Sequence, residues 1–181
     1  MVVEPEKTVT SRKVYSGRAI NLRVDTVQLS QGRTSQREIV EHGGSVSIVP
    51  LDGRGNVLMV RQYRKAVGQV LLEVPAGGMD EGETPEVCAR RELEEETGYT
   101  ARRMERLASF FTTPGFCDEE MHAFLATGLT AGQPRPEADE SIEVVAVPLS
   151  SIPRMIQQGD VRDAKSIAAL LLVAEREVAG A

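Results

Sequence analysis

Residues 76–99 read AGGMDEGETPEVCARRELEEETGY, a glycine-rich loop that runs into a segment with clear signals for the start and the end of a helix. Thr84 can accept a hydrogen bond as an N-cap residue, and Pro85 suits the first helical position because an N–H there would have no helical partner. Gly98 is typical of the residue that ends a helix, since glycine adopts a positive φ without strain. These signals predict a helix over residues 85–97.

Ordinary surface pairing explains part of the charge on this predicted helix. A spacing of four residues would pair Arg90 with Glu94 and Arg91 with Glu95, as on many solvated helix faces. Four of the charged residues therefore require no functional explanation.

Glu92 and Glu96 do not fit this pairing. They lie four positions apart on one face, and no Lys or Arg stands three or four positions from either of them. Like charges at this spacing cost about 0.2 to 0.5 kcal/mol in an isolated helix. A Mg²⁺ ion, which is commonly held by one or two carboxylates together with substrate phosphates, would relieve the repulsion. With Glu83 of the loop nearby, the sequence predicts a Mg²⁺ site, and Mn²⁺ is the alternative because the two ions share ligand preferences.

The whole chain is small and acidic. Its 181 residues, of which 41% are hydrophobic, predict one main core. A formal net charge of −6 argues against a nucleic-acid partner, because phosphate backbones attract clustered Lys and Arg. The longest apolar run, residues 167–174, is far shorter than the roughly 20 residues that cross a bilayer, and the acidic N-terminus is unlike a signal peptide. We therefore expect a cytoplasmic protein that binds neither nucleic acid nor membrane.

Alternation of apolar and polar side chains predicts that most of the remaining elements are strands. Residues 20–29 and 37–41 are expected to form a hairpin around a turn at residues 30–33. Further strands are expected at residues 46–51, 57–63, 70–74, 107–112, 121–126 and 142–147. Between the first two of these, the glycines of DGRGN, residues 52–56, are expected to supply positive φ in a tight connection. Asp163 is expected to cap a C-terminal helix with an apolar stripe that begins at Ile167.

Nine residues of the opening stretch match the Nudix box without a gap. They are Gly77, Glu83, Arg91, Glu92, Leu93, Glu95, Glu96, Gly98 and Tyr99. The chain thus resembles the Nudix hydrolase family, and the predicted loop and helix are the context that this motif requires. The resemblance implies an α/β fold, an α/β/α sandwich around a mixed β-sheet, with a small N-terminal antiparallel β-sheet. It also implies a β-rich dimerisation lobe at residues 1–42 and a Nudix hydrolase domain at residues 43–181.

Outside the box, the sequence is similar to the ADP-ribose pyrophosphatase subgroup. Pro114, 16 residues after Gly98, carries this likeness together with residues 60–64, 72–77 and 163–165. It implies a homodimer that hydrolyses the diphosphate linkage of ADP-ribose, with Mg²⁺, to AMP and ribose 5-phosphate. GDP-mannose hydrolases look alike over this region, so another nucleoside diphosphate sugar is the alternative substrate. A third reading, a module that binds a nucleotide sugar without cleaving it, is disfavoured because the box is whole.

The resemblance also implies roles for individual residues. The implied metal ligands are the backbone carbonyl of Ala76, with Glu92, Glu96 and, secondarily, Glu83. The implied substrate contacts are Arg64, Pro114, Gly115 and Arg37, the last reaching the nucleotide of a partner subunit. Arg91 and Glu95 are catalytic candidates: Arg91 is expected to orient Glu95 and the loop rather than touch the substrate, and Glu95 is, like Glu83, a secondary candidate for binding the metal.

Hydrolysis also requires a base, which the resemblance places outside the box, on the loop before a late strand. The acidic residues in that region are Glu137, Asp139, Glu140 and Glu143. The match of residues 142–144 to the subgroup favours Glu140 among them.

Overall fold

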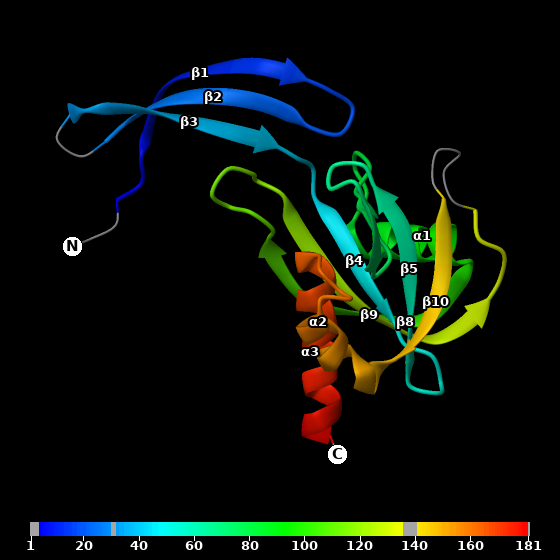
Figure 1. Cartoon of the computed structure of the whole chain (residues 1–181). Helices are drawn as coiled ribbons and strands as arrows, with labels where there is room; N and C mark the ends of the chain where they lie inside the picture. The colour runs from blue at the N-terminus through cyan, green and yellow to red at the C-terminus, as the bar shows by residue number, and fades with distance from the viewer. Residues whose placement is uncertain (1–3, 30–31, 136–140, 181) are drawn as a thin grey trace. The chain divides into compact units, whose positions relative to one another are not determined.

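A computed structural model describes residues 4–29, 32–135 and 141–180 of the chain, with side chains as far as residue 176. The chain forms two compact units (Figure 1): unit 1 comprises Met1–Gly43 and Phe111–Glu120, and unit 2 comprises Gly44–Phe110 and Met121–Ala181. The elements are β1 Lys7–Ser16, β2 Asn21–Gln28, β3 Thr34–Glu41, β4 Ser45–Pro50, β5 Asn56–Arg64, β6 Gln69–Glu73, β7 Ala76–Gly78, α1 Pro85–Thr97, β8 Tyr99–Phe111, β9 Glu120–Ala131, β10 Ile142–Pro148, the 3₁₀ turn η2 Leu149–Ser151, α2 Ile152–Gln158 and α3 Ala164–Gly180.

Unit 1 is built on the antiparallel sheet β1-β2-β3. The predicted hairpin of β2 and β3 is confirmed, with Asn21 opposite Glu41 and Gln28 opposite Thr34. The segment Phe111–Glu120 joins this unit because the Val40 N–H donates to the Phe116 carbonyl at 2.7 Å and the Asp118 N–H donates to the Val40 carbonyl at 3.2 Å. Strand β1 was not predicted, since every residue in it is exposed and no apolar face marks it in the sequence.

Unit 2 contains two sheets with the strand orders β7-β4-β9-β8 and β10-β5-β6. Strand β4 runs parallel to β9 and antiparallel to β7, so the first sheet is mixed, as expected. All six residues of β4 are buried, which is typical of a central strand covered on both faces.

Helices cover both faces of this mixed sheet. On one face Val46 and Ile48 pack with Leu93 of α1, and on the other Val49 packs with Ile152 of α2 and Leu170 of α3. The side chains alternate between the faces because successive residues of a strand point to opposite sides. Figure 1 shows α1 and α3 on opposite sides of the strands, which confirms the α/β/α arrangement.

The helix boundaries follow the local signals in the sequence. Helix α1 spans the predicted residues, with its Thr84 hydroxyl accepting from the Val87 N–H at 3.4 Å and Gly98 at a φ of 75°. The Asp163 carboxylate accepts from the Ser166 N–H at 3.0 Å and so caps α3 as predicted. The seven-residue helix α2 was not predicted.

The turn between β4 and β5 differs from its prediction in one respect. Gly55 has a φ of 79°, whereas Gly53 is not among the positive-φ glycines. The Asp52 carboxylate accepts hydrogen bonds from the Arg54 and Asn56 N–H groups, both at 2.8 Å, so this side chain shapes the turn together with Gly55. The two flanking strands then continue into different sheets.

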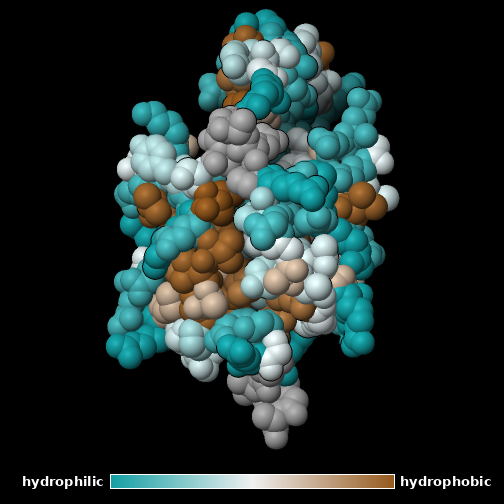
Figure 2. All heavy atoms as spheres, turned by 90° about the vertical axis from the view of Figure 1, so that its right-hand side faces the viewer, coloured by the Kyte–Doolittle hydropathy of each residue, from teal (hydrophilic) through white to brown (hydrophobic). Residues whose placement is uncertain are grey.

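On the face that Figure 2 displays, hydrophilic residues predominate and hydrophobic residues gather over part of it. Large apolar side chains are also exposed in unit 1, where Val9, Val14 and Tyr15 of β1 are 54%, 47% and 56% exposed. In the described part of the chain no helix is long and apolar enough to cross a membrane.

Candidate active site

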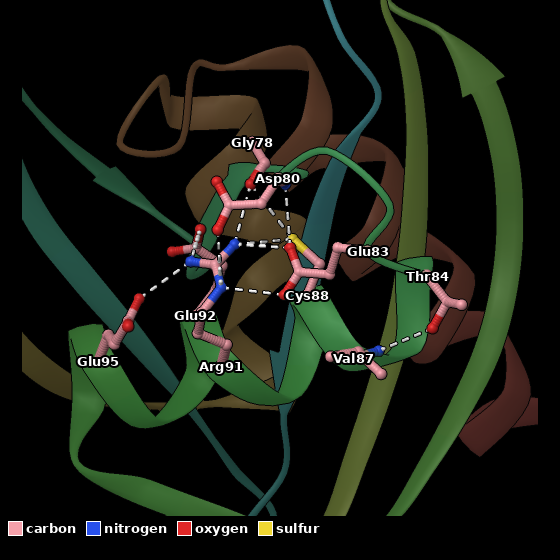
Figure 3. A network of polar contacts seen from close by, with 9 residues as sticks. All are labelled: Gly78, Asp80, Glu83, Thr84, Val87, Cys88, Arg91, Glu92 and Glu95. Atoms are coloured by element: carbon pink, nitrogen blue, oxygen red, sulfur yellow. Dashed lines mark hydrogen bonds and ion pairs between the residues drawn. The ribbon is translucent and has the colours of Figure 1, made fainter.

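The guanidinium of Arg91 ties the glycine-rich loop to helix α1 (Figure 3). It donates to both carboxylate oxygens of Glu83, at 3.0 and 2.9 Å, and to the Gly78 carbonyl at 3.1 Å. It also donates to Glu92 at 2.8 Å and to Glu95 at 3.0 Å. Arg91 therefore lies between Glu95 and the loop, the position that its predicted orienting role requires.

Two of the ion pairs on α1 differ from those expected. Arg90 binds Glu86, one turn before it, at 2.9 Å instead of Glu94. Glu92 does have a local cation, because the adjacent Arg91 reaches it. The prediction considered only cations three and four positions from Glu92, because residues at that spacing are neighbours on a helix. The long side chain of Arg91 turns back toward the loop and, on the way, contacts the carboxylate of the next residue, Glu92.

The carboxylate of Glu92 lies directly over the backbone of Gly77. A Cβ atom at Gly77 would stand 2.0 Å from Glu92 Oε1, so the Glu92 carboxylate would have to move away if this residue carried a side chain. The first glycine of the box is thus explained by the close approach of a carboxylate, a contact that the sequence alone did not reveal.

Glu96 approaches the same strand, β7. Its side chain belongs to a residue that is only 4% exposed, and its Oε2 accepts from the Ala76 N–H at 3.3 Å. Glu92 and Glu96 therefore meet the strand that also carries the Ala76 carbonyl, so the predicted metal ligands lie on adjoining elements.

This donor set fits a hard divalent cation. All the donors are oxygen atoms, and a carboxylate as buried as Glu96 requires a compensating positive charge or hydrogen bonds. Among the described residues, no group of three or more His, Cys, Asp or Glu side chains is arranged to hold a metal. With the ligands predicted from the sequence, Glu92, Glu96 and the Ala76 carbonyl, the protein would supply two carboxylates and one backbone carbonyl, a set that suits Mg²⁺ with water or phosphate oxygens as further ligands.

Arg91 also controls the ionisation of Glu83. Its hydrogen bonds hold the pKa of Glu83 at about 2, against the opposing effect of burial, and the same contacts raise the pKa of Arg91. Nearby, burial raises the pKa of the Cys88 thiol to about 12, which keeps this thiol protonated at neutral pH. Glu83 is thus a carboxylate at neutral pH, bound to an arginine rather than exposed to solvent.

Arg64, a predicted substrate contact, is held by a residue that the sequence did not single out. Its Nε and Nη2 donate to the Glu73 carboxylate, with the shortest contact at 2.7 Å. Glu73 is 1% exposed and also accepts from Lys165 Nζ at 2.8 Å. The only signal for Glu73 was its place in the stretch 72–77 that resembles the subgroup.

The remaining predicted substrate contacts come together in unit 1. Arg37, Pro114 and Gly115 line an open depression of about 440 Å³, and Phe111 and Phe116 line it as well. Arg37 is additionally ion-paired with Glu6. The box carboxylates and Arg64 belong to unit 2, so the predicted residues divide between the two units.

The predicted base, Glu140, lies outside the described residues, as do Glu137 and Asp139. The fourth candidate, Glu143, lies on β10 with a side chain that is 66% exposed and paired with Arg61 at 3.2 Å. Arg135, the last described residue before residue 141, donates its N–H to the Glu95 carbonyl at 2.8 Å.

Comparisons with known proteins agree with the box and the fold. A NUDIX domain model matches residues 41–170. The chain is 41% identical to the ADP-ribose pyrophosphatase of Bacillus subtilis (strain 168), over 91% of this chain and 90% of that protein. It is 40% identical to the methanol dehydrogenase activator of Bacillus methanolicus, with the same two coverages. A solved structure titled as an ADP compounds hydrolase superposes with a TM-score of 0.89 at 22% identity, covering 99% of this chain and 98% of the other. On the box residues, the α/β/α fold and these matches, the chain belongs to the Nudix family of hydrolases.

Proposed function

We propose that this Nudix hydrolase uses a divalent metal to split the diphosphate linkage of ADP-ribose, giving AMP and ribose 5-phosphate. The proposal rests on one observation: the carboxylates of Glu92 and Glu96 both approach β7, the strand that contains the Ala76 carbonyl. The substrate is suggested by the 41% identical relative that is named for it. Mg²⁺ is the proposed ion, with Mn²⁺ as the alternative.

Each residue of the site has a proposed task. Glu92, Glu96 and the Ala76 carbonyl would hold the metal, which would supply positive charge to neutralise the phosphoryl oxygens of the diphosphate. Arg91 keeps the loop and Glu95 in place through its hydrogen bonds. Glu140 is proposed to take the proton of the attacking water.

Substrate contacts are proposed in both units. Arg64 contacts the diphosphate, because a guanidinium offers several donors to phosphate oxygens. Arg37, Pro114 and Gly115 contact the nucleotide of a partner subunit in a homodimer, and the depression that they line has the aromatic side chains of Phe111 and Phe116 for contact with a base. The homodimer, with residues 1–42 as its dimerisation lobe, and the cytoplasmic location remain predictions.

The proposal is tested by the release of AMP from ADP-ribose in the presence of Mg²⁺. Glu96→Gln should lower kcat by about 10²- to 10³-fold, since it weakens the binding of the ion that would stabilise the transition-state charge, and loss of one such stabilising group costs about that much. The matched control is Glu94→Gln, which changes an exposed glutamate two residues away on the same helix and should leave kcat within twofold. Equal activity of the two variants, or no AMP from the wild-type protein, would refute the proposal.

Competing substrates settle the choice of nucleotide sugar. With ADP-ribose and GDP-mannose at equal concentration, kcat/KM should favour ADP-ribose, because specificity is decided by that ratio. A preference for GDP-mannose would replace the proposed substrate with the alternative one.

A further inference from the structure

Glu73, at the end of β6, is a buried carboxylate with two cationic partners. It is 1% exposed, and it is bound by Arg64 of β5 on one side and by Lys165 of α3 on the other. Arg64 engages it through Nε and Nη2, a side-on contact that fixes the plane of the guanidinium and leaves Nη1 on the edge that does not face Glu73. The orientation of Arg64 therefore depends on where the Glu73 carboxylate is held.

The first turn of α3 fixes the position of that carboxylate. Lys165 Nζ donates to Glu73 Oε2 and to Asp163 Oδ1, both at 2.8 Å, while the same Asp163 oxygen caps the helix. The next residue, Ser166, accepts at its hydroxyl from the Val74 N–H at 2.8 Å, inside the core. Two consecutive residues of α3 thus hold the last residue of β6, Glu73, and the residue that follows it, Val74.

The charges of Arg64, Lys165, Glu73 and Asp163 sum to zero, and loss of any one of these side chains leaves a net charge in the cluster. Burial raises the pKa of Glu73, but the hydrogen bonds of Arg64 and the charge of Lys165 outweigh it, so that the pKa is lowered overall. Without Lys165, Arg64 would be the one remaining partner among these four that could neutralise the buried carboxylate. Loss of Lys165 would leave the buried Glu73 charge less fully compensated, which is costly, so the Glu73 carboxylate and the Arg64 guanidinium bound to it would shift from their present positions.

We propose that Lys165, held by Asp163, is a positioning residue that acts through Glu73 to orient Arg64 for the diphosphate of the substrate. This inference rests on the proposed function, because Arg64 is assigned to the diphosphate there. It adds to that function a residue outside the Nudix box, on a helix that begins about 100 residues after Arg64 in sequence.

The test compares four variants of the full chain by KM and kcat for ADP-ribose with saturating Mg²⁺. Arg64→Ala and Lys165→Met should each raise KM about tenfold and change kcat less than threefold, since both weaken a contact made throughout the reaction. Lys165→Arg should restore KM to within about twofold or threefold, because the cation returns. The control Arg162→Met removes an exposed cation of the same region, bound to Gln69 at 3.0 Å, and should leave KM unchanged.

The double variant separates positioning from a merely structural role. In the Arg64→Ala background, Lys165→Met should cause no further rise in KM, since the two residues act as one unit. Multiplied effects of the two substitutions, or a fall in thermal stability with no change in KM, would overturn the positioning role. If Arg64→Ala itself leaves KM unchanged, the assignment of Arg64 in the proposed function is wrong, and the inference falls with it. A rise in KM for Arg64→Ala but not for Lys165→Met overturns the inference alone.

Discussion

One arginine side chain determines how the loop of the Nudix box meets its helix. Arg91 contacts carboxylates of Glu83, Glu92 and Glu95 at once, so its single positive charge is shared by three negative ones. This arrangement leaves the site with an excess of negative charge that a divalent cation would balance. The pairing of Glu83 with Arg91 makes a prediction about pH.

Glu83→Gln should destabilise the metal-free protein at neutral pH and not at low pH. The folded-state pKa of Glu83 is about 2, below its ordinary value of 4.5, so its ionised form stabilises the fold above about pH 4.5. This stabilisation is lost as the pH falls from about 4.5 to about 2. At pH 7 the substitution should lower the free energy of unfolding by about 1 kcal/mol, the usual scale for one charged hydrogen-bonded contact near the surface.

Urea denaturation in EDTA at pH 7, 4 and 3 measures this effect. The control is Glu81→Gln, an exposed glutamate of the same loop, which should match the wild-type protein at each pH. A penalty for Glu83→Gln that stays constant down to pH 3 would contradict the assigned pKa.

At the scale of elements, the end of α1 is joined to the connector that follows β9. Gly98 has a φ of 75°, and a Cβ atom there would stand 2.5 Å from the backbone nitrogen of Pro134. The Gly132 N–H donates to the Gly98 carbonyl at 2.7 Å. The last glycine of the box therefore ends the helix and also admits the start of the connector.

Gly98→Ala should destabilise the protein more than Gly159→Ala does. Both residues end helices at a positive φ, which costs an alanine about 1 to 2 kcal/mol, but a Cβ at Gly159 meets nothing within 4 Å. The collision with Pro134 should add about 1 to 3 kcal/mol for Gly98→Ala. Chemical denaturation of the two variants measures the difference between their free energies of unfolding. Equal losses of stability would show that the connector at Pro134 can move aside without a loss of free energy.

The sequence predicted these elements well where local chemistry determines them. The bounds of α1 followed from Thr84, Pro85 and Gly98, and the cap of α3 followed from Asp163, because caps depend on residues next to one another. Strand β1 was missed because its residues are all exposed, so its pairing with β2 leaves no periodic apolar pattern.

The candidate site was predictable only in part for a related reason. The residues of the box share one loop and one helix, so their spacing reveals them. Glu73 and Lys165 are 92 residues apart, and the fold alone makes them partners. The contact between Gly77 and Glu92 was also hidden, because it depends on how closely β7 approaches α1.

At the scale of the whole molecule, the exposed apolar side chains of β1 bear on whether two copies of the chain associate. Val14 and Tyr15 are apolar or aromatic, exposed, and part of a strand at the edge of its sheet. Edge strands with exposed apolar residues favour pairing with another chain. This surface is consistent with the predicted homodimer.

Light scattering after gel filtration tests the dimer. The wild-type protein should have a mass of about 39 kDa, twice the 19.7 kDa of one chain. Tyr15→Asp should shift it toward the monomer, because a charge is costly in a contact that excludes water. Val67→Asp, at an exposed valine of unit 2, is the matched control and should remain dimeric. A wild-type monomer would refute the dimer and the role of Arg37 in a partner's site.

The two cysteines differ in a way that is of practical use. Cys88 is buried in α1 and its thiol contacts the Gly78 carbonyl, whereas Cys117 is only partly buried and lines the depression of unit 1. A maleimide dye applied at neutral pH would thus attach at one known place in the unmodified chain. Its fluorescence could report nucleotide arrival at that depression in real time, without any engineered label.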